Sequence, residues 1–373
     1  RAGMHVRVVK KIHESDDNTA TLLESGDVDY IISTSTKGRD PARDSVKIRG
    51  LASRLGIPCL TSIDTANAVA NSLLSRYSEI NTELVDLNHM RKERMRLQFI
   101  KMEACGNDYI YFDCFRQQVT SPESLAIALS DRHFGVGGDG VVLICPSDIA
   151  DAKMLMYNLD GSEGMMCGNA IRCVGKYLYD NGMVRGRDIT IDTASGLKKL
   201  ELFTKDGLVS SARVDMGKAY FKPEEVPVKL EGQSVIARQQ TIGGVAYDIT
   251  CLSMGNPHCV VFRDDIESMD IQAVGSAFEH HPLFPERVNT EFARIINENT
   301  LRMRVWERGS GETLACGTGA CAAAVAAVEN GYCKKGEDIL VQLPGGDLII
   351  CYTDQAVYMT GSAHKVFEGT LEI

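Results

Sequence analysis

"CGNAIRCVGKYLYDNG" (residues 167–182) and "CGTGACAAAVAAVENG" (residues 316–331) are the two stretches of this 373-residue chain that decide its fold. Both are 16 residues long, begin with Cys-Gly, continue with a helical pattern and end with Asn-Gly. Asn-Gly ends a helix because Gly adopts the left-handed conformation beyond the last turn. The two stretches therefore look like copies of one element, a helix with a cysteine at its entrance.

A second pair of stretches supports this duplication. "GNDYIYFD" (residues 106–113) and "GNPHCVVFRD" (residues 255–264) each place Gly-Asn before a run typical of a strand. Gly106 precedes Cys167 by 61 positions, and Gly255 precedes Cys316 by the same 61. Two ordered pairs at equal separation indicate an internal repeat.

The segments between these motifs favour strands over helices. Strand patterns cover residues 140–146, 188–194, 208–216 and 338–344, separated by turn residues. We therefore expect an α+β fold with two pseudo-symmetric halves, each with strands wrapped around a central helix.

Composition narrows the class of partner. No run approaches the roughly 18 apolar residues of a membrane span, and no signal peptide is visible, so we expect a cytoplasmic protein without a membrane partner. The formal net charge of −10 and the lack of a basic stripe argue against nucleic acid. A small-molecule partner is the remaining expectation.

The twelve cysteines are spread along the chain without a CxxC pair, so we expect reduced thiols and no structural metal site. Cys173 and Cys321, within the predicted helices, are expected to pack in the core. A buried, inert role is also the prediction for Cys59, Cys114, Cys145, Cys251, Cys259, Cys333 and Cys351.

Cys167 and Cys316 differ from the others because they precede helices. A helix N-terminus favours the thiolate and lowers the pKa of a thiol, and its free N–H groups bind anions. Two such entrances facing one cleft would hold a carboxylate, with the thiols on opposite faces of the adjacent carbon. One thiolate could remove the α-proton of an amino acid while the other thiol returns one, without a cofactor. A redox pair or inert packing remains open at this point.

Six motifs, in order, resemble those of the diaminopimelate epimerase family over residues 97–373: "FIKMEACGNDYIYFD", "FGVGGDG", "NLDGSEGMMCGNAIRC", "SMGNPHCVVF", "VNTEFARI" and "WERGSGETLACGTGACAA". The resemblance implies a cofactor-independent enzyme that converts LL-2,6-diaminopimelate to the meso form, in lysine and peptidoglycan-precursor synthesis. Diaminopimelate is then the expected partner, and a homodimer the expected assembly.

The resemblance also implies roles for individual residues. Cys167 and Cys316 become the catalytic bases, and His258 and Glu307 help to set their protonation. The N–H groups for the reacting carboxylate come from Gly168, Asn169, Gly317 and Thr318. The residues that bind the substrate, most of them at its distal L-centre, are Asn107, Asn158, Asn256, Asn289 and Arg308.

Several of these residues also have a purely structural interpretation. An Asn before a strand is usually a turn residue, and Glu307 next to Arg308 is usually a solvated pair. One departure from the family pattern is Gly140, where some members have Gln. Two further alternatives are a proline-racemase-like enzyme and a non-enzymatic thiol-redox or effector-binding regulatory protein.

Residues 1–88 carry none of these motifs. We expect strands in residues 27–35 and 57–63 and helices in 42–56 and 65–80. Together they resemble the C-terminal half of a methylglyoxal-synthase-like domain, as in the carbamoyl phosphate synthase large subunit. Residues 89–96 are predicted as a linker, and the halves of the epimerase as 97–213 with 361–373, and 214–360. This pattern suggests a truncated fusion with a passive appendage.

Overall fold

The computed structural model describes residues 6–33, 44–74 and 96–372. The chain forms two compact units, residues 1–93 and 94–373. No helix in the described ranges is long and apolar enough to cross a membrane.

The first unit contains short elements that agree with the predicted order of strands and helices. A parallel pair of two-residue strands runs beside two helices. The helix predicted over residues 42–56 is present within two residues of both ends, and the one predicted over 65–80 begins two residues earlier, while its predicted end lies outside the described residues. A further helix over Thr19–Glu24 was not predicted. Residues 34–35, 42–43, 75–80 and 89–95 of the predicted elements and linker lie outside the described residues. The elements are α1 (Thr19–Glu24), β1 (Ile31–Ile32), α2 (Asp44–Leu55), β2 (Cys59–Leu60) and α3 (Ile63–Leu74).

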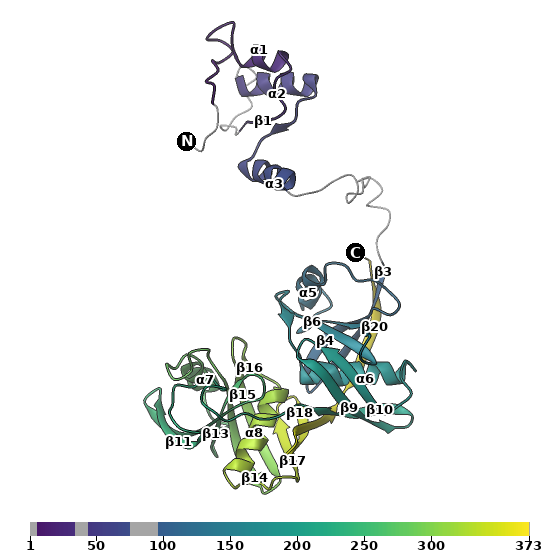
Figure 1. Cartoon of the computed structure of the whole chain (residues 1–373), viewed down its shortest axis with the longest axis vertical. Helices are drawn as coiled ribbons and strands as arrows, with labels where there is room; N and C mark the ends of the chain where they lie inside the picture. Colours follow the sequence, from purple (N-terminus) through teal and green to yellow (C-terminus); the bar gives the residue numbers. More distant parts are fainter. Residues whose placement is uncertain (1–5, 34–43, 75–95, 373) are drawn as a thin grey trace. The chain divides into compact units, whose positions relative to one another are not determined.

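The second unit is built mostly from strands, and each of its two lobes surrounds one helix (Figure 1). The first lobe contains β3 (Arg96–Ala104), β4 (Asn107–Asp113), α5 (Pro122–Ser130), β5 (Gly140–Cys145), β6 (Ala152–Asn158), β7 (Glu163–Gly164), α6 (Gly168–Asp180), β8 (Asp188–Thr193), β9 (Gly196–Lys205) and β10 (Leu208–Asp215).

The second lobe repeats this order with one additional strand at its start. It contains β11 (Val235–Ile242), β12 (Val245–Ser253), β13 (Pro257–Phe262), α7 (Ile271–Glu279), β14 (Asn289–Asn297), β15 (Thr300–Glu307), β16 (Gly311–Thr313), α8 (Gly317–Glu329), β17 (Asp338–Leu343), β18 (Gly346–Tyr352) and β19 (Val357–Ser362). The last strand, β20 (His364–Glu372), returns to the first lobe and pairs with β3 (Figure 1).

Strand pairing follows the same scheme in both lobes. The parallel pair β4–β5 corresponds to β13–β14, and the parallel pair β6–β8 corresponds to β15–β17. β10 and β19 pair in antiparallel orientation and join the two lobes through backbone hydrogen bonds. The equal spacing of the sequence motifs therefore reflects a repeated order of elements and a repeated pairing scheme.

The central helices begin at the predicted cysteines. Cys167 is the N-cap of α6 and accepts a hydrogen bond from the backbone N–H of Ala170, while Cys316 is the N-cap of α8 and accepts from Gly319. Alanine side chains let most of α8 lie buried among the surrounding strands. The four strands predicted between the motifs are present within one residue of their expected ends.

The cysteine predictions are confirmed in part. Cys173 and Cys321 are fully buried in the helices, Cys251, Cys259 and Cys351 are buried in strands, and Cys333 is buried in the loop after α8. Cys59, Cys114 and Cys145 are only partly buried, so that prediction was wrong for them. They lie at strand ends, where an apolar sequence pattern does not determine how much cover the rest of the fold provides.

Candidate active site

A cavity of about 610 Å³ contains both helix entrances. All of the predicted site residues line it, except His258 and Asn289. A second cavity of about 840 Å³ shares five lining residues with the first, among them the predicted site residues Asn107, Asn158 and Glu307. The fold therefore brings residues from both lobes to one site.

The two helix entrances pack against the same side chain, Met359 of β19. A Cβ atom on Gly168 would lie 2.6 Å from Met359 Cε, and one on Gly317 would lie 3.1 Å from Met359 Sδ. Because glycine stands at both positions, the backbones of α6 and α8 approach each other closely, and the helices are in contact. The free N–H groups of both helices are therefore available around one small volume, which suits an anion.

The pKa of each thiol differs from the sequence prediction. Burial raises the pKa of Cys167, although N–H groups of Ala170 and Asn169 and the charge of Arg172 act in the opposite direction. Burial also raises the pKa of Cys316 well above its ordinary value, and the charges of Glu307 and Glu291 add to this effect. The predicted lowering was wrong because removal from water outweighs the helix terminus.

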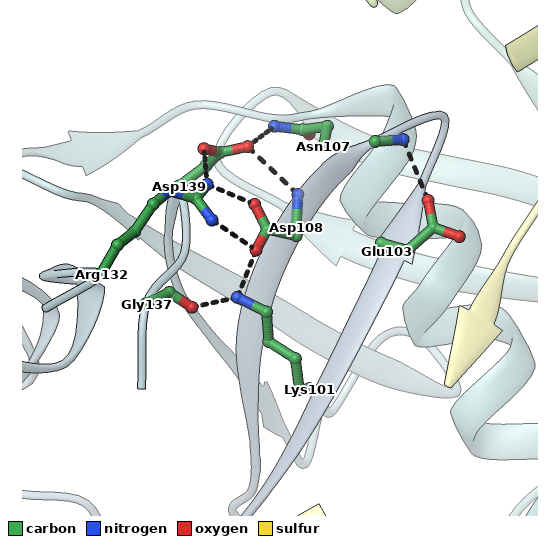
Figure 2. A network of polar contacts seen from close by, with 8 residues as sticks. Lys101, Glu103, Asn107, Asp108, Arg132, Gly137 and Asp139 are labelled. Carbon is green, nitrogen blue, oxygen red and sulfur yellow. Dashed lines mark hydrogen bonds and ion pairs between the residues drawn. The ribbon is translucent and has the colours of Figure 1, made fainter. Parts of the chain in front are cut away.

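Cys167 lies beside an acceptor. Its Sγ is 3.2 Å from Asn107 Oδ1, at the start of β4. Asn107 Nδ2 donates to Asp139 Oδ2 at 2.6 Å, and Figure 2 shows this carboxylate also facing Asp108 and Arg132. The thiol in the first lobe is thus the end of a chain of polar side chains that reaches the surface.

Cys316 has a different set of neighbours. Its Sγ lies 3.5 Å from Thr318 Oγ1, and Asn256 Nδ2 donates to the same hydroxyl at 3.3 Å. Glu307 accepts hydrogen bonds from Thr313 and from Cys316. Burial raises the pKa of Glu307 despite these bonds.

His258 supports the second lobe from the core. Its Nε2 lies 2.9 Å from Asn256 Oδ1, and its Nδ1 lies 2.7 Å from Glu291 Oε1. His258 and Glu291 are fully buried, and burial raises the pKa of Glu291. His258 therefore reaches Cys316 through Asn256 and Thr318 and not by direct contact.

Asn289 lies behind the cavity and orients Arg308. Its Oδ1 accepts a hydrogen bond from the backbone N–H of Arg308 at 2.8 Å, and its Nδ2 donates to Pro257 O at 3.1 Å. Arg308 lines the cavity, and its Nη1 donates to Glu286 O at 3.0 Å. The guanidinium group of Arg308 is therefore held by the loop that precedes β14.

Comparison with known proteins agrees with this arrangement. The sequence model for diaminopimelate epimerase matches residues 99–222 and 250–366. The chain belongs to the diaminopimelate epimerase family. A diaminopimelate epimerase from Acetivibrio thermocellus is 50% identical over 279 residues, which cover 74% of this chain and 99% of the relative.

Solved structures show the same mixed α/β fold at low sequence identity. A phenazine biosynthesis protein of the PhzF family from Bacillus anthracis matches with a TM-score of 0.57 at 15% identity, over 75% of this chain and 100% of that chain. A probable proline racemase from Agrobacterium radiobacter, with bound carbonate, matches with a TM-score of 0.55 at 15% identity, over 73% and 92%. At this identity the likeness concerns the fold alone.

Within this epimerase-family unit, several residues near the site were not predicted from the sequence. Asp139 and Glu291 hold Asn107 and His258, and Arg172 is a fully buried cation one helical turn after Cys167. Arg172 donates to the carbonyl groups of Gly168 and Ser362. Asp139 and Glu291 lie within the motifs of the sequence analysis. The sequence around a carboxylate in a glycine loop or a strand does not indicate which side chain it contacts.

Gly140, the departure from the family pattern, is required by the backbone. Its φ is +155°, and a Cβ atom there would lie 2.1 Å from Tyr157 O. A glutamine at this position is therefore incompatible with the observed path of β5. In the described residues, no group of three or more His, Cys, Asp or Glu side chains is placed to hold a metal ion.

Proposed function

We propose that this member of the family converts LL-2,6-diaminopimelate to meso-diaminopimelate without a cofactor, using Cys167 and Cys316 as the two bases. The observation that carries the proposal is that both cysteines cap helices whose entrances line one cavity. The family membership and the 50% identity to a diaminopimelate epimerase support the same substrate.

In the proposed mechanism, the N–H groups after each cysteine hold the carboxylate next to the reacting carbon. These groups belong to Gly168, Asn169, Gly317 and Thr318. They stabilise the negative charge that develops when the α-proton leaves. Asn169 Oδ1 is buried without a partner and lines the cavity, so it is available to accept from an ammonium group.

The proton transfers balance between the two thiols. The thiolate of one cysteine takes the α-proton, and the electron pair of the broken C–H bond remains on the substrate carbon. The thiol of the other cysteine then gives its proton to the opposite face of that carbon, which inverts the centre. The enzyme ends with the thiol and thiolate exchanged, and proton exchange with water restores the starting form.

Glu307 and His258 set the protonation of Cys316 in this proposal. Glu307 acts directly, since it accepts a hydrogen bond from the thiol, and His258 acts through Asn256 and Thr318. When a turnover begins with the thiolate of Cys316, Glu307 first accepts the proton that leaves the Cys316 thiol.

The distal amino-acid head of the substrate is bound by the amides and the guanidinium group that line the cavity. Arg308 suits a carboxylate, and the oxygen atoms of Asn107, Asn158 and Asn256 suit an ammonium group. Asn289 contributes by positioning the Arg308 backbone. A proline-sized substrate would leave these groups unpaired, which favours diaminopimelate over the proline-racemase-like alternative.

Deuterium exchange tests the proposed reaction. The wild-type protein, kept reduced, is incubated with LL-diaminopimelate in D₂O, and we expect deuterium at one α-carbon together with the meso isomer. Proline under the same conditions is the matched control substrate and should remain unlabelled. Absence of exchange into diaminopimelate would contradict the enzymatic assignment and favour the thiol-redox or regulatory alternative. Exchange into proline would favour the racemase alternative.

We also propose the finer domain assignment. Residues 97–213 with 361–373 form one half, and 214–360 form the other; the pairing of β20 with β3 supports this division. Residues 1–88 are proposed to resemble a methylglyoxal-synthase-like domain and residues 89–96 to form a linker, supported by the parallel pair β1–β2 with its helices. A homodimer in the cytoplasm remains part of the proposal.

A shortened chain that starts at Met95 tests the passive role of the first unit. Because residues 94–373 form a compact unit of their own, we expect this chain to fold and to keep the turnover of the full chain. Circular dichroism and the exchange assay measure the two properties. Loss of folding would contradict the idea that the first unit is an appendage.

A further inference from the structure

Asn107 offers its carbonyl oxygen to Cys167, and the network around Asp139 explains why. A carboxylate only accepts hydrogen bonds, so the Asn107 amide nitrogen has to face Asp139 Oδ2. The amide carbonyl oxygen then points the other way and lies 3.2 Å from Cys167 Sγ. The orientation of this amide is thus fixed by chemistry and by geometry.

Asp139 is itself held on both oxygen atoms. Oδ2 also accepts from the backbone N–H of Asp108 at 3.1 Å, and Oδ1 accepts from Arg132 Nη2 at 3.0 Å (Figure 2). Arg132 makes a second pair with Asp108 at 2.7 Å, and Asp108 pairs with the buried Lys101 at 2.5 Å. These contacts leave Asp139 little freedom to turn away from Asn107.

Lys101 connects the network to the loop that carries Asp139. Its Nζ donates to Gly137 O, two residues before Asp139, and only 6% of its side chain is exposed. Burial raises the pKa of Asp108, but hydrogen bonds from Arg132 and Lys101 outweigh this effect and leave the pKa below its ordinary value. The Asp108 carboxylate therefore stays charged and keeps both cations in place.

We propose that Asp139 is a positioning residue for Cys167: its carboxylate holds the Asn107 amide so that the amide oxygen accepts the hydrogen of the thiol. The inference rests on the proposed function in assigning Cys167 as a base, but the orientation of the amide does not depend on turnover. In the absence of substrate Asp139 thereby keeps Cys167 in its thiol form.

The second lobe has no carboxylate at the corresponding place. Asn256, which follows Gly255 as Asn107 follows Gly106, directs its oxygen to His258 and its nitrogen to Thr318. A Thr318 hydroxyl that accepts from Asn256 has its own hydrogen free for Cys316 Sγ, 3.5 Å away. The first lobe therefore presents an amide oxygen to its thiol, whereas in the second lobe the Cys316 thiol contacts a hydroxyl that can donate to it as well as the Glu307 carboxylate that accepts from it.

Other groups near Cys167 affect its protonation and have to be kept constant in a test. They come from β4, α6 and β15, and none of them forms a hydrogen bond with Asp139. They are Tyr109 and Tyr111 of β4, Arg172 and Cys173 of α6, and Glu307 of β15.

Asp139→Asn is the sharpest test because it changes one acceptor into a donor at equal size. In either orientation of the new amide, its NH₂ group faces another donor, either Arg132 or the pair formed by Asn107 and Asp108 N–H. Asn107 is then free to turn its nitrogen towards Cys167, which favours the thiolate. Site-resolved alkylation with iodoacetamide at neutral pH should modify Cys167 about tenfold faster than in wild type, as expected for losing a hydrogen bond to the thiol form.

Cys316 should react at its wild-type rate, and the rise of kcat/KM with pH should move to lower pH. Asp131→Asn, in the same loop without contact to Asn107, is the matched control and should leave both rates unchanged. A folded Asp139→Asn variant with wild-type reactivity of Cys167 would overturn the proposal. If that variant does not fold, Arg132→Gln provides a second test because it removes one group that holds the Asp139 carboxylate. The alkylation rate of Cys167 should then rise by a smaller factor, and an unchanged rate would overturn the proposal.

The two proposals fail in distinguishable ways. If the wild-type protein does not exchange deuterium into diaminopimelate, the proposed function is wrong, while the labelling of Cys167 still reports the orientation of Asn107. If deuterium exchange occurs and Cys167 reacts at the same rate in the wild type and in Asp139→Asn, only the positioning role of Asp139 is wrong.

Discussion

The two lobes repeat their elements and their pairing scheme but support their cysteines by different means. In the first lobe, Cys167 is held through Asn107 by a carboxylate network that includes Arg132, whose side chain is 57% exposed. In the second lobe, Cys316 is held through Asn256 by the fully buried pair His258 and Glu291. A duplicated fold thus places two equivalent thiols in unequal electrostatic surroundings.

Removing either thiol should have the largest effect, because inversion requires both. We expect Cys167→Ala and Cys316→Ala each to lower the rate of epimerisation by about 10³-fold or more, as for groups that act as a unit. Thermal unfolding should show that both variants remain folded. A variant with near-normal turnover would contradict the requirement for both thiols, and with it the comparison between the two lobes.

Breaking the buried pair should cost more stability than breaking the surface network. His258→Leu leaves Glu291 buried without its partner, and we expect the free energy of unfolding to fall by about 3 kcal/mol. Arg132→Met removes an exposed partner from the first-lobe network, and we expect a loss of about 1 kcal/mol. Urea unfolding compares the two variants.

The sign of the pH dependence sharpens this comparison. Burial raises the pKa of Glu291, so the protonated form is tolerated in the folded state. In His258→Leu the loss of stability should therefore be small at acid pH and grow as the pH rises through that pKa. Equal losses for the two variants at all pH values would contradict the distinction between the buried pair and the exposed network.

The smallest expected effect is a shift in a pH profile. Burial raises the pKa of both thiols, so kcat/KM of the wild type should rise with pH above neutrality as one thiolate forms. Glu307→Gln removes a charge that raises the pKa of Cys316, and the rise should move to lower pH. Its matched control, Glu312→Gln, changes an exposed carboxylate that pairs with Arg304 and should keep the wild-type profile. An unshifted Glu307→Gln profile would indicate that Glu307 does not set the protonation of Cys316.

The sequence was sufficient for the repeat and its elements because these depend on local pattern. Asn-Gly after an apolar helix and Gly-Asn before a β-branched run mark element ends through backbone preferences, and α6, α8, β4 and β13 are present where they were predicted. The separation of 61 residues then brought Cys167 and Cys316 into corresponding places. The parallel pairs β4–β5 and β13–β14 follow the same repeat.

Properties that depend on burial were not accessible in the same way. The pKa of Cys167 and Cys316 was predicted from the helix terminus alone, and the cost of removing each thiol from water reverses the direction. The role of Asp139 could not be predicted because its partner, Asn107, lies 32 positions earlier in the chain. His258 was predicted to act near the thiols, but its link through Asn256 requires knowledge of which side chains meet in space.

The pairing of β20 with β3 has a consequence for the synthesis of the protein. Their ladder joins Glu372 to Arg96, partners separated by 276 positions in the chain. The first lobe leaves the ribosome long before β20 is synthesised. One edge of β3 therefore remains unpaired while the whole second lobe is translated. Exposed edges of this kind promote association between chains. Completion of the first lobe is therefore the last event of assembly, even though its residues are made first.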